Sequence, residues 1–290
     1  MKTIGKLVVV GVGLIGGSTA LALRRAGLVG HVTGVGRSRA NLDEALRLGI
    51  LDAATDDYAG ALAGADVVLV TTPVAQMPAV FAQIAPHLQP ATVVTDGGST
   101  KQDVIAAARA ALGAKFAQFV PGHPIAGTEH TGAAAAFPEL FSGRRVVLAP
   151  EPETDAAATA RVVGMWEATG ASVALMPAAR HDSIFATVSH LPHLLAFALV
   201  EELALRPDAP EYFAFAAGGF RDFTRIASSS PEMWRDIAIA NRDALLAELR
   251  VYRNQLERME RMLAASDAEG LGTLFATARE ARNEWLAGQR

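Results

Sequence analysis

The 290-residue chain contains no cysteine. This absence excludes disulfides, thiolate catalysis and cysteine-ligated metal sites, and it is consistent with a reducing compartment. The chain also has no excess of basic residues, since 26 Lys and Arg are set against 30 Asp and Glu, for a net charge of −4. Because domains that bind nucleic acid usually carry a basic face, we expect no nucleic-acid partner.

Convincing membrane-spanning or secretory segments are also missing. The apolar stretch at residues 184–200 is shorter than a typical span and contains two histidines, a serine and a proline. At the N-terminus, Lys2 and Lys6 precede an apolar run as in a secretory signal, but four glycines within residues 11–17 interrupt that run. We therefore expect a cytoplasmic protein with no membrane partner.

Residues 6–18, KLVVVGVGLIGGS, carry the most informative local pattern in the chain. Residues 7–10 are typical of a strand buried on both faces of a parallel sheet, and residues 18–25 follow at helical spacing. Between them, Gly11, Gly13 and Gly16 match G-x-G-x-x-G in the strand–turn–helix context of a dinucleotide site. A glycine-rich turn without a ligand is the alternative, and the flanking strand and helix favour the cofactor.

Strands and helices alternate through the first part of the chain. We predict further strands at 31–35, 66–72, 92–95, 119–120, 146–148 and 172–175, and helices at 41–48, 75–88, 102–112 and 154–169. This order is typical of an α/β Rossmann-like doubly wound sheet. From residue 182 the pattern is helical, with loops at 207–210 and 217–220. We therefore predict a dinucleotide-binding domain over 1–177 and an all-α substrate and dimerisation domain over 178–290.

The end of the second strand bears on the choice between NADP and NAD. An acidic residue usually stands there to bind the ribose 2′-hydroxyl of NAD, but this chain has Gly36 followed by Arg37. Because arginine can clamp a 2′-phosphate, the sequence favours NADP over NAD. A solvated basic loop is the alternative. The predicted cofactor contacts are Gly11, Gly13, Leu14, Ile15, Gly16, Arg37, Ser38, Thr72 and Pro73.

Several polar residues are candidates for chemistry. His123 lies in a Gly/Pro-rich loop after a predicted strand, where it could accept a proton or be structural. Ser99 follows two glycines and could approach the same ligand or cap the next helix. His190 and His193 lie three residues apart and share a helix face. They have no third ligand at suitable spacing, so we predict no metal.

The helical domain contains two further features. Arg225, in the segment GGFRDFTR, could form a buried pair with Asp222 or bind a substrate carboxylate. Downstream, apolar residues at heptad spacing predict a seam that packs against an internal helix or against a second subunit. The seam residues are Leu245, Leu249, Tyr252, Leu256, Met259 and Leu263.

Six segments in order, GVGLIGGS, DGGSTK, GHPIAGTE, SHLPH, GGFRDFTRIA and MWRDI, resemble the prephenate/arogenate (cyclohexadienyl) dehydrogenase family of tyrosine biosynthesis. The resemblance extends from Lys6 to about Leu263. It implies a Rossmann-like domain followed by a helical domain that forms a homodimer. It also implies a monofunctional enzyme that oxidatively decarboxylates prephenate or arogenate, with hydride transfer to NADP or NAD.

The resemblance also implies roles for individual residues. His123 corresponds to the family's catalytic base, and Ser99 contacts the same region. His193 and Arg225 line the substrate site, together with Thr128 and Glu129 in the segment that follows His123.

Two rival functions remain. A β-hydroxy acid dehydrogenase of similar layout would use a lysine on the second domain, but lysine occurs only at positions 2, 6, 101 and 115. A non-catalytic NADP-sensing protein would have no reason to retain His123, Ser99 and Arg225 together. Both rivals are therefore less favoured than the dehydrogenase of tyrosine biosynthesis.

Overall fold

The computed structural model describes residues 3–128 and 130–288. The chain divides into two compact units, Met1–Arg242 and Asp243–Arg290. The first unit contains all the strands and the helices up to α11 of the described chain, and the second contains the last helices.

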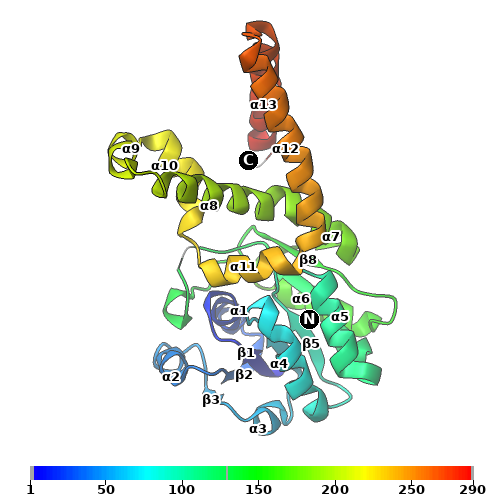
Figure 1. Cartoon of the computed structure of the whole chain (residues 1–290). Coiled ribbons are helices and arrows are strands. Elements are labelled where there is room, and N and C mark those ends of the chain that lie inside the picture. The colour runs from blue at the N-terminus through cyan, green and yellow to red at the C-terminus, as the bar shows by residue number, and fades with distance from the viewer. Residues whose placement is uncertain (1–2, 129, 289–290) are drawn as a thin grey trace. The chain divides into compact units, whose positions relative to one another are not determined.

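A six-stranded parallel sheet lies at the centre of the first unit (Figure 1). Its strand order is β3-β2-β1-β4-β5-β6, so the order reverses direction between β1 and β4. Ligands of open α/β sheets bind at the carboxyl ends of the strands beside such a switch point. The strands are β1 (Ile4–Val10), β2 (Val29–Val35), β3 (Ala53–Thr55), β4 (Val67–Val70), β5 (Val93–Asp96) and β6 (Phe119–Val120).

Side chains along β1 alternate between two apolar cores, one on each face of the sheet. Leu7 and Val9 enter the first core, whereas Val8 and Val10 enter the second. Helices α1 (Leu14–Arg25), α2 (Arg39–Arg47) and α6 (Ala156–Glu167) contribute to the first core. Helices α3 (Tyr58–Leu62), α4 (Met77–Ile84) and α5 (Gln102–Leu112) contribute to the second. The predicted doubly wound, Rossmann-like sheet is confirmed.

Short helical turns and one short strand complete the region around the six-stranded sheet, and some of them were not predicted. The 3₁₀ turns are η1 (Val74–Gln76), η2 (Ala85–His87), η3 (Gly113–Gln118) and η4 (Ala133–Ala135). Strand β3 and helix α3 are absent from the sequence prediction. Both are too short to show periodicity, and α3 depends on the Asp57 carboxylate, which accepts hydrogen bonds from the N–H groups of Ala59 and Gly60.

A second sheet has the order β7-β8-β9, with β7 (Gly122–Pro124) antiparallel to β8 (Arg145–Leu148) and β9 (Ser172–Leu175) parallel to β8. His123 was predicted in a loop, but it pairs with Val147 within β7. The prediction of a loop was wrong, because a segment rich in Gly and Pro can still pair as a short strand at the edge of a sheet. Strand β7 is an edge strand, where the missing N–H of a proline is tolerated.

The rest of the first unit is helical. It comprises α7 (Ala178–Phe185), the π-helical turn η5 (Ala186–His190), α8 (Leu191–Ala204), α9 (Ala209–Phe215), α10 (Gly218–Thr224), the 3₁₀ turn η6 (Arg225–Ser228) and α11 (Pro231–Ala240). The loops predicted at 207–210 and 217–220 are confirmed at 207–208 and 217, but their remaining residues belong to α9 and α10. Pro210 lies in the first turn of α9, where a proline costs no intrahelical hydrogen bond.

Helices α7 and α8 with η5 form one helical run over Ala178–Ala204. By length and composition alone this run could cross a membrane, and 28% of its most apolar window is buried. The expectation that the apolar stretch is too short for a span is therefore wrong, because the helix begins before residue 184. The run nevertheless carries buried polar side chains, among them His181, Asp182 and His190.

The second unit consists mainly of α12 (Arg242–Ala264) and α13 (Ala268–Ala287). Helix α12 contains the predicted heptad seam. Leu256 and Leu263 of that seam are 47% and 65% exposed, and Trp285 of α13 is 60% exposed. Part of the seam is therefore left uncovered by the described part of the chain, whereas Leu245 is buried.

Candidate active site

The glycine turn after β1 has the geometry of a pyrophosphate site. Gly11 has a φ of +91°, and a Cβ there would lie 2.8 Å from the backbone N of Thr72. A Cβ on Gly16 would lie 2.5 Å from Thr71 Oγ1, so only glycine lets α1 pack this closely on the sheet. A Cβ on Gly13 would meet nothing within 4 Å, and no side chain caps the start of α1. The first N–H groups of α1 can therefore receive a phosphate.

The segment after β2 is where the ribose would lie. A Cβ on Gly36 would approach Leu42 no closer than 3.5 Å, so a side chain fits there. Arg37 is exposed. Ser38 has a local role, because its hydroxyl accepts a hydrogen bond from Asn41 N (3.3 Å) and caps α2. A cationic side chain thus stands beside an open position at the end of β2.

The loops that carry the candidate residues meet at the carboxyl end of the sheet. A Cβ on Gly97 would lie 3.3 Å from Ile15 Cγ2 and 3.6 Å from Pro124 Cδ. The glycine turn, the loop after β5 and strand β7 are therefore neighbours. This places the segments that carry Ser99 and His123 beside the predicted cofactor site. Thr72 is half-buried nearby, and its Oγ1 has no hydrogen-bond partner among the described residues.

Ser99 does not cap the following helix, so that alternative is wrong. Helix α5 begins at Gln102, and its N-cap residue is Lys101. The backbone N–H groups of Lys101 and Gln102 donate instead to the Asp182 carboxylate of α7, at 2.8 and 2.9 Å. The start of α5 is thus capped by Asp182, a residue distant in the sequence. The half-buried Ser99 is not needed as a cap.

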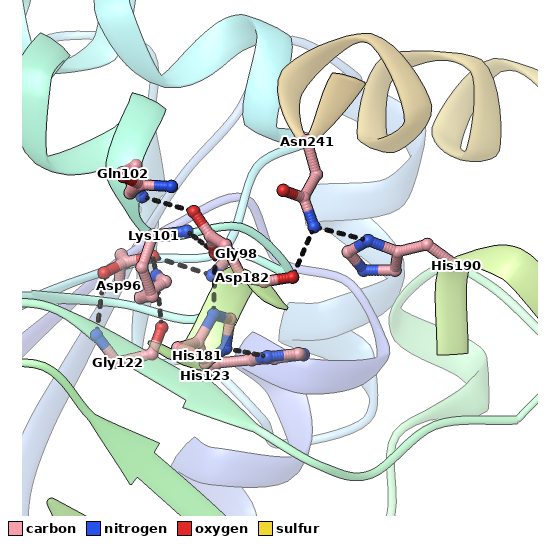
Figure 2. Close-up of polar contacts among 10 residues, drawn as sticks. All are labelled: Asp96, Gly98, Lys101, Gln102, Gly122, His123, His181, Asp182, His190 and Asn241. Carbon is pink, nitrogen blue, oxygen red and sulfur yellow. Dashed lines mark hydrogen bonds and ion pairs between the residues drawn. The ribbon is translucent and has the colours of Figure 1, made fainter. Parts of the chain in front are cut away.

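His123 lies beside the ring of His181 (Figure 2). Its Nδ1 is 2.8 Å from Nε2 of His181, and its ring centroid is 4.8 Å from that of Phe185. Burial lowers the pKa of His123 well below its ordinary value, and His181, Lys101 and His190 contribute in the same direction. His123 is therefore neutral at neutral pH and can accept a proton.

A second group of residues gathers around Trp234 of α11. The His193 ring stacks on Trp234 with centroids 3.4 Å apart, and His193 Nδ1 donates to the carbonyl of Ser189 (2.9 Å). Burial lowers the pKa of His193, and the nearby Arg225 also lowers it. Arg225 and Asp222 are both exposed, so the expectation of a buried pair between them is wrong. The structure thus brings His193 and Arg225 together, with the guanidinium accessible to an anion.

The long helical run is irregular just before Pro192. The π-helical turn Ala186–His190 precedes that proline, which lies in the first turn of α8. His190 Nδ1 accepts a hydrogen bond from Asn241 Nδ2 (3.0 Å), and burial is the main effect that lowers the pKa of His190 to about 4. The turn thereby directs His190 inward beside Asn241, while His193 faces Trp234.

A buried ion pair supports the loop between β5 and α5. Lys101 and Asp96 are both fully buried and paired, and Lys101 Nζ also donates to the carbonyl of Gly122 (2.6 Å). Asp96 accepts from the N–H groups of Gly98 (2.8 Å) and Gly122 (2.9 Å). Burial raises the pKa of Asp96, although Lys101 opposes the shift. Figure 2 shows how these contacts tie the β5 loop to β7.

Sequence reasoning missed most of this supporting network. His181, Asp182 and Asn241 were not among the predicted site residues, and neither was Trp234. An adjacent His-Asp pair was visible in the sequence, but no local pattern connects it with His123. Of the remaining predicted residues, Thr128 is exposed and its hydroxyl accepts from His130 N (3.2 Å), Pro73 is exposed, and Glu129 lies outside the described residues. The described residues contain no group of His, Asp or Glu side chains that could hold a metal.

The Rossmann-like sheet, the open glycine turn and a histidine on the strand beside it are typical of an NAD(P)-dependent dehydrogenase. Two family models match the chain: the nucleotide-binding domain of prephenate dehydrogenase over residues 19–175, and its dimerization domain over residues 177–277. The chain therefore belongs to the prephenate dehydrogenase family. The resemblance drawn from the six sequence segments is confirmed.

Individual relatives agree with this assignment. The chain is 36% identical over 279 residues to a prephenate dehydrogenase of Bacillus subtilis, covering 96% of this chain and 75% of the relative. It is 35% identical over 284 residues to a cyclohexadienyl dehydrogenase of Zymomonas mobilis, covering 97% and 96%. The crystal structure of Aquifex aeolicus prephenate dehydrogenase with hydroxyphenyl propionate and NAD+ superimposes with a TM-score of 0.92, at 34% identity and coverage of 97% and 98%.

Proposed function

We propose that this protein catalyses the oxidative decarboxylation of prephenate or arogenate, with hydride transfer to NADP or NAD, in tyrosine biosynthesis. The observation that carries the proposal is the placement of His123, hydrogen-bonded to His181 on the strand beside the glycine turn, in a chain of the prephenate dehydrogenase family. The relatives support the substrate class. Two of them are named prephenate dehydrogenase and cyclohexadienyl dehydrogenase, and the A. aeolicus structure holds a hydroxyphenyl compound with NAD+.

Each candidate residue has a role in this reaction. Gly11, Gly13 and Gly16, with Leu14 and Ile15, would hold the pyrophosphate at the start of α1, and Thr72 and Pro73 would border the nicotinamide. The bound cofactor supplies the hydride acceptor. His123 takes the proton of the ring hydroxyl as hydride leaves the same carbon. The carboxylate then departs as carbon dioxide, its bonding electrons complete the aromatic ring, and the proton held by His123 returns to the phenolate oxygen.

The remaining residues position the substrate. Arg225 binds a substrate carboxylate, because a guanidinium pairs with carboxylates in a bidentate geometry. His193 and Thr128 line the same site, and Glu129 completes the predicted set. Ser99 contacts the ring hydroxyl region beside His123. Since aromatisation drives the reaction, the main task of the protein is to align the ring with the nicotinamide.

Steady-state assays test the proposed function. The purified chain is incubated with prephenate or arogenate, each with NADP and with NAD, and reduced nicotinamide is measured together with the aromatic product. We expect turnover with at least one substrate, and none with a β-hydroxy acid used as a control. Tight cofactor binding without turnover of either cyclohexadienyl substrate would contradict the proposal and favour a cofactor-sensing protein.

We propose that NADP is preferred over NAD, as Gly36 and Arg37 indicate. Arg37→Ala should lower kcat/KM for NADP on the order of tenfold, because it removes a charge-assisted contact to the 2′-phosphate. Gly36→Asp should shift the preference toward NAD, and the open space around Gly36 accommodates the new side chain. Arg39→Ala is a matched control, since Arg39 pairs with Asp43 (2.9 Å). Preference for NAD in the unmodified enzyme would mean that Arg37 faces solvent.

We propose that the chain forms a homodimer through its helical part. The dimerization-domain match and the exposed apolar side chains of the α12 seam support this assembly. Light scattering should give about twice the 30.3 kDa mass of one chain. Leu256→Glu combined with Leu263→Glu should weaken the dimer, whereas Asn254→Glu, at an exposed position outside the seam, should not. A mass of one chain for the unmodified protein would contradict the assembly.

The functional boundary and the location of the protein are part of the same proposal. We place the boundary between cofactor and substrate parts at residues 177/178, supported by the separate family matches over 19–175 and 177–277.

We propose a cytoplasmic protein without nucleic-acid or membrane partners. The net charge of −4 and the buried polar residues of the Ala178–Ala204 run support this. Apolar residues exposed on that run, such as Val188 and Leu199, would then face a second copy.

A further inference from the structure

A chain of three side chains extends inward from His123. His123 Nδ1 lies 2.8 Å from His181 Nε2, and His181 Nδ1 lies 2.8 Å from Asp182 Oδ1. His181 is fully buried and Asp182 is 2% exposed. Figure 2 shows His181 between the other two side chains, with one dashed contact to His123 and one to Asp182.

The proton positions in this chain follow from Asp182. Its carboxylate accepts the backbone N–H groups of Lys101 and Gln102 at 2.8 and 2.9 Å. Although burial opposes ionisation, the hydrogen bonds from His181 and these backbone groups lower the pKa of Asp182. Asp182 is therefore an ionised acceptor, and His181 Nδ1 must carry the proton that it donates to the carboxylate.

The tautomer of His123 is then determined as well. Burial lowers the pKa of His181, so His181 is neutral at neutral pH. A neutral His181 protonated on Nδ1 has an unprotonated Nε2, which can only accept a hydrogen bond. His123 must therefore be protonated on Nδ1, and its lone pair lies on Nε2.

We infer that His181 and Asp182 position His123 for catalysis by holding the His123 tautomer whose Nε2 accepts the substrate proton. This inference rests on the proposed function. It extends the orienting logic of a carboxylate behind a catalytic histidine, with a second histidine interposed. After His123 accepts the proton on Nε2, its Nδ1–H remains donated to His181, and the charge is stabilised through His181 by the Asp182 carboxylate.

The other groups around His123 do not replace this pair. Lys101, from the loop before α5, is occupied by Asp96 and the carbonyl of Gly122. His190, from η5, accepts from Asn241. Phe185 of α7 packs on the rings of both His123 and His181, with centroids 4.8 and 4.5 Å away, and offers no hydrogen bond. Among the described residues, His181 is the one side chain hydrogen-bonded to His123 Nδ1.

Asp182 has a second role, which determines the choice of variants. It also caps α5, and its backbone carbonyl accepts from Asn241 Nδ2 (2.8 Å). Replacing Asp182 would therefore disturb the fold, so the test uses His181. His181→Phe keeps a ring against Phe185 but removes both hydrogen bonds. His181→Gln supplies a carbonyl that can accept from His123 and an amide that can donate to Asp182.

The first measurement needs no substrate. Nitrogen-15 NMR of histidine-labelled unmodified protein with bound cofactor reports which ring nitrogen of His123 is protonated, and His123→Asn identifies the resonances. We expect protonation on Nδ1 in the unmodified protein and a mixture of tautomers in His181→Phe. Protonation of His123 on Nε2 in the unmodified protein would overturn the inference. This outcome stays separate from failure of the proposed function, which would appear as no turnover of prephenate or arogenate.

Kinetics provide the second measurement. His181→Phe should lower kcat on the order of 10- to 100-fold, because a misoriented base loses alignment, with KM changed by less than about threefold. His181→Gln should recover much of that loss, and His87→Gln, at a position remote from the site, should be neutral. Thermal unfolding confirms that each variant is folded. A folded His181→Phe enzyme with unchanged kcat would overturn the inference, as would a His181→Gln enzyme as slow as His181→Phe.

Discussion

His123→Asn should lower kcat by about 10²- to 10⁴-fold while KM changes little. Asparagine keeps a hydrogen-bonding group of similar size, so the substrate should still bind, but it cannot accept the proton of the ring hydroxyl. The loss would therefore appear in the chemical step. Turnover of prephenate or arogenate under saturating cofactor measures both constants.

The pH profile gives the same prediction a second readout. The base must be neutral, and burial holds the pKa of His123 well below the ordinary value of a histidine. In the unmodified enzyme kcat should stay level through neutral pH and fall only at pH values below the ordinary range of histidine, where His123 becomes protonated. In His123→Asn this acid limb should disappear, whereas His87→Asn should leave it in place. A near-normal kcat with the limb intact would assign the base to another group, and His190 and His193 would be tested next.

Arg225→Ala should raise KM for prephenate and arogenate by about 30-fold. Truncating one partner of a charge pair buried in a complex costs about 2–5 kcal/mol. We expect the lower end, because the guanidinium is exposed before the substrate covers it. Both substrates should be affected alike if Arg225 binds a carboxylate that they share, since they differ only in a keto or amino group of the side chain.

Two variants sharpen this test. Arg225→Lys keeps the charge but loses the bidentate fork, so KM should fall between those of the unmodified and alanine enzymes. Arg235→Ala is the matched control, because Arg235 is exposed on α11 and pairs with its neighbour Asp236 (2.7 Å). Unchanged KM values for both substrates in Arg225→Ala would show that the arginine is structural.

Features that depend on neighbouring residues were predictable from the sequence. The apolar run of β1 has both faces buried, and the predicted bounds of α5, β6 and β9 agree with the structure. The spacing of Gly11, Gly13 and Gly16 between a strand and a helix predicted the turn, and the structure adds the close contacts of Gly11 and Gly16 with the residues after β4. Here the local pattern and the global fold favour the same conformation. The family segments identified the chain for the same reason, since each is a short local motif.

Tertiary structure alone decided how the site is assembled. The hydrogen bond between His123 and His181 joins residues 58 positions apart, and the Asp182 carboxylate caps α5 across 81 positions. A sequence shows that a histidine is adjacent to an aspartate, but not which donor that aspartate meets after α7 packs against α5. Burial of Lys101, Asp96 and His181 likewise arises only when the sheet and the helical region enclose them. The sequence by itself determined the fold class and the glycine turn, and it indicated His123 as the candidate base. The protonation state and tautomer of His123 depend on desolvation and on partners that only the folded chain brings together.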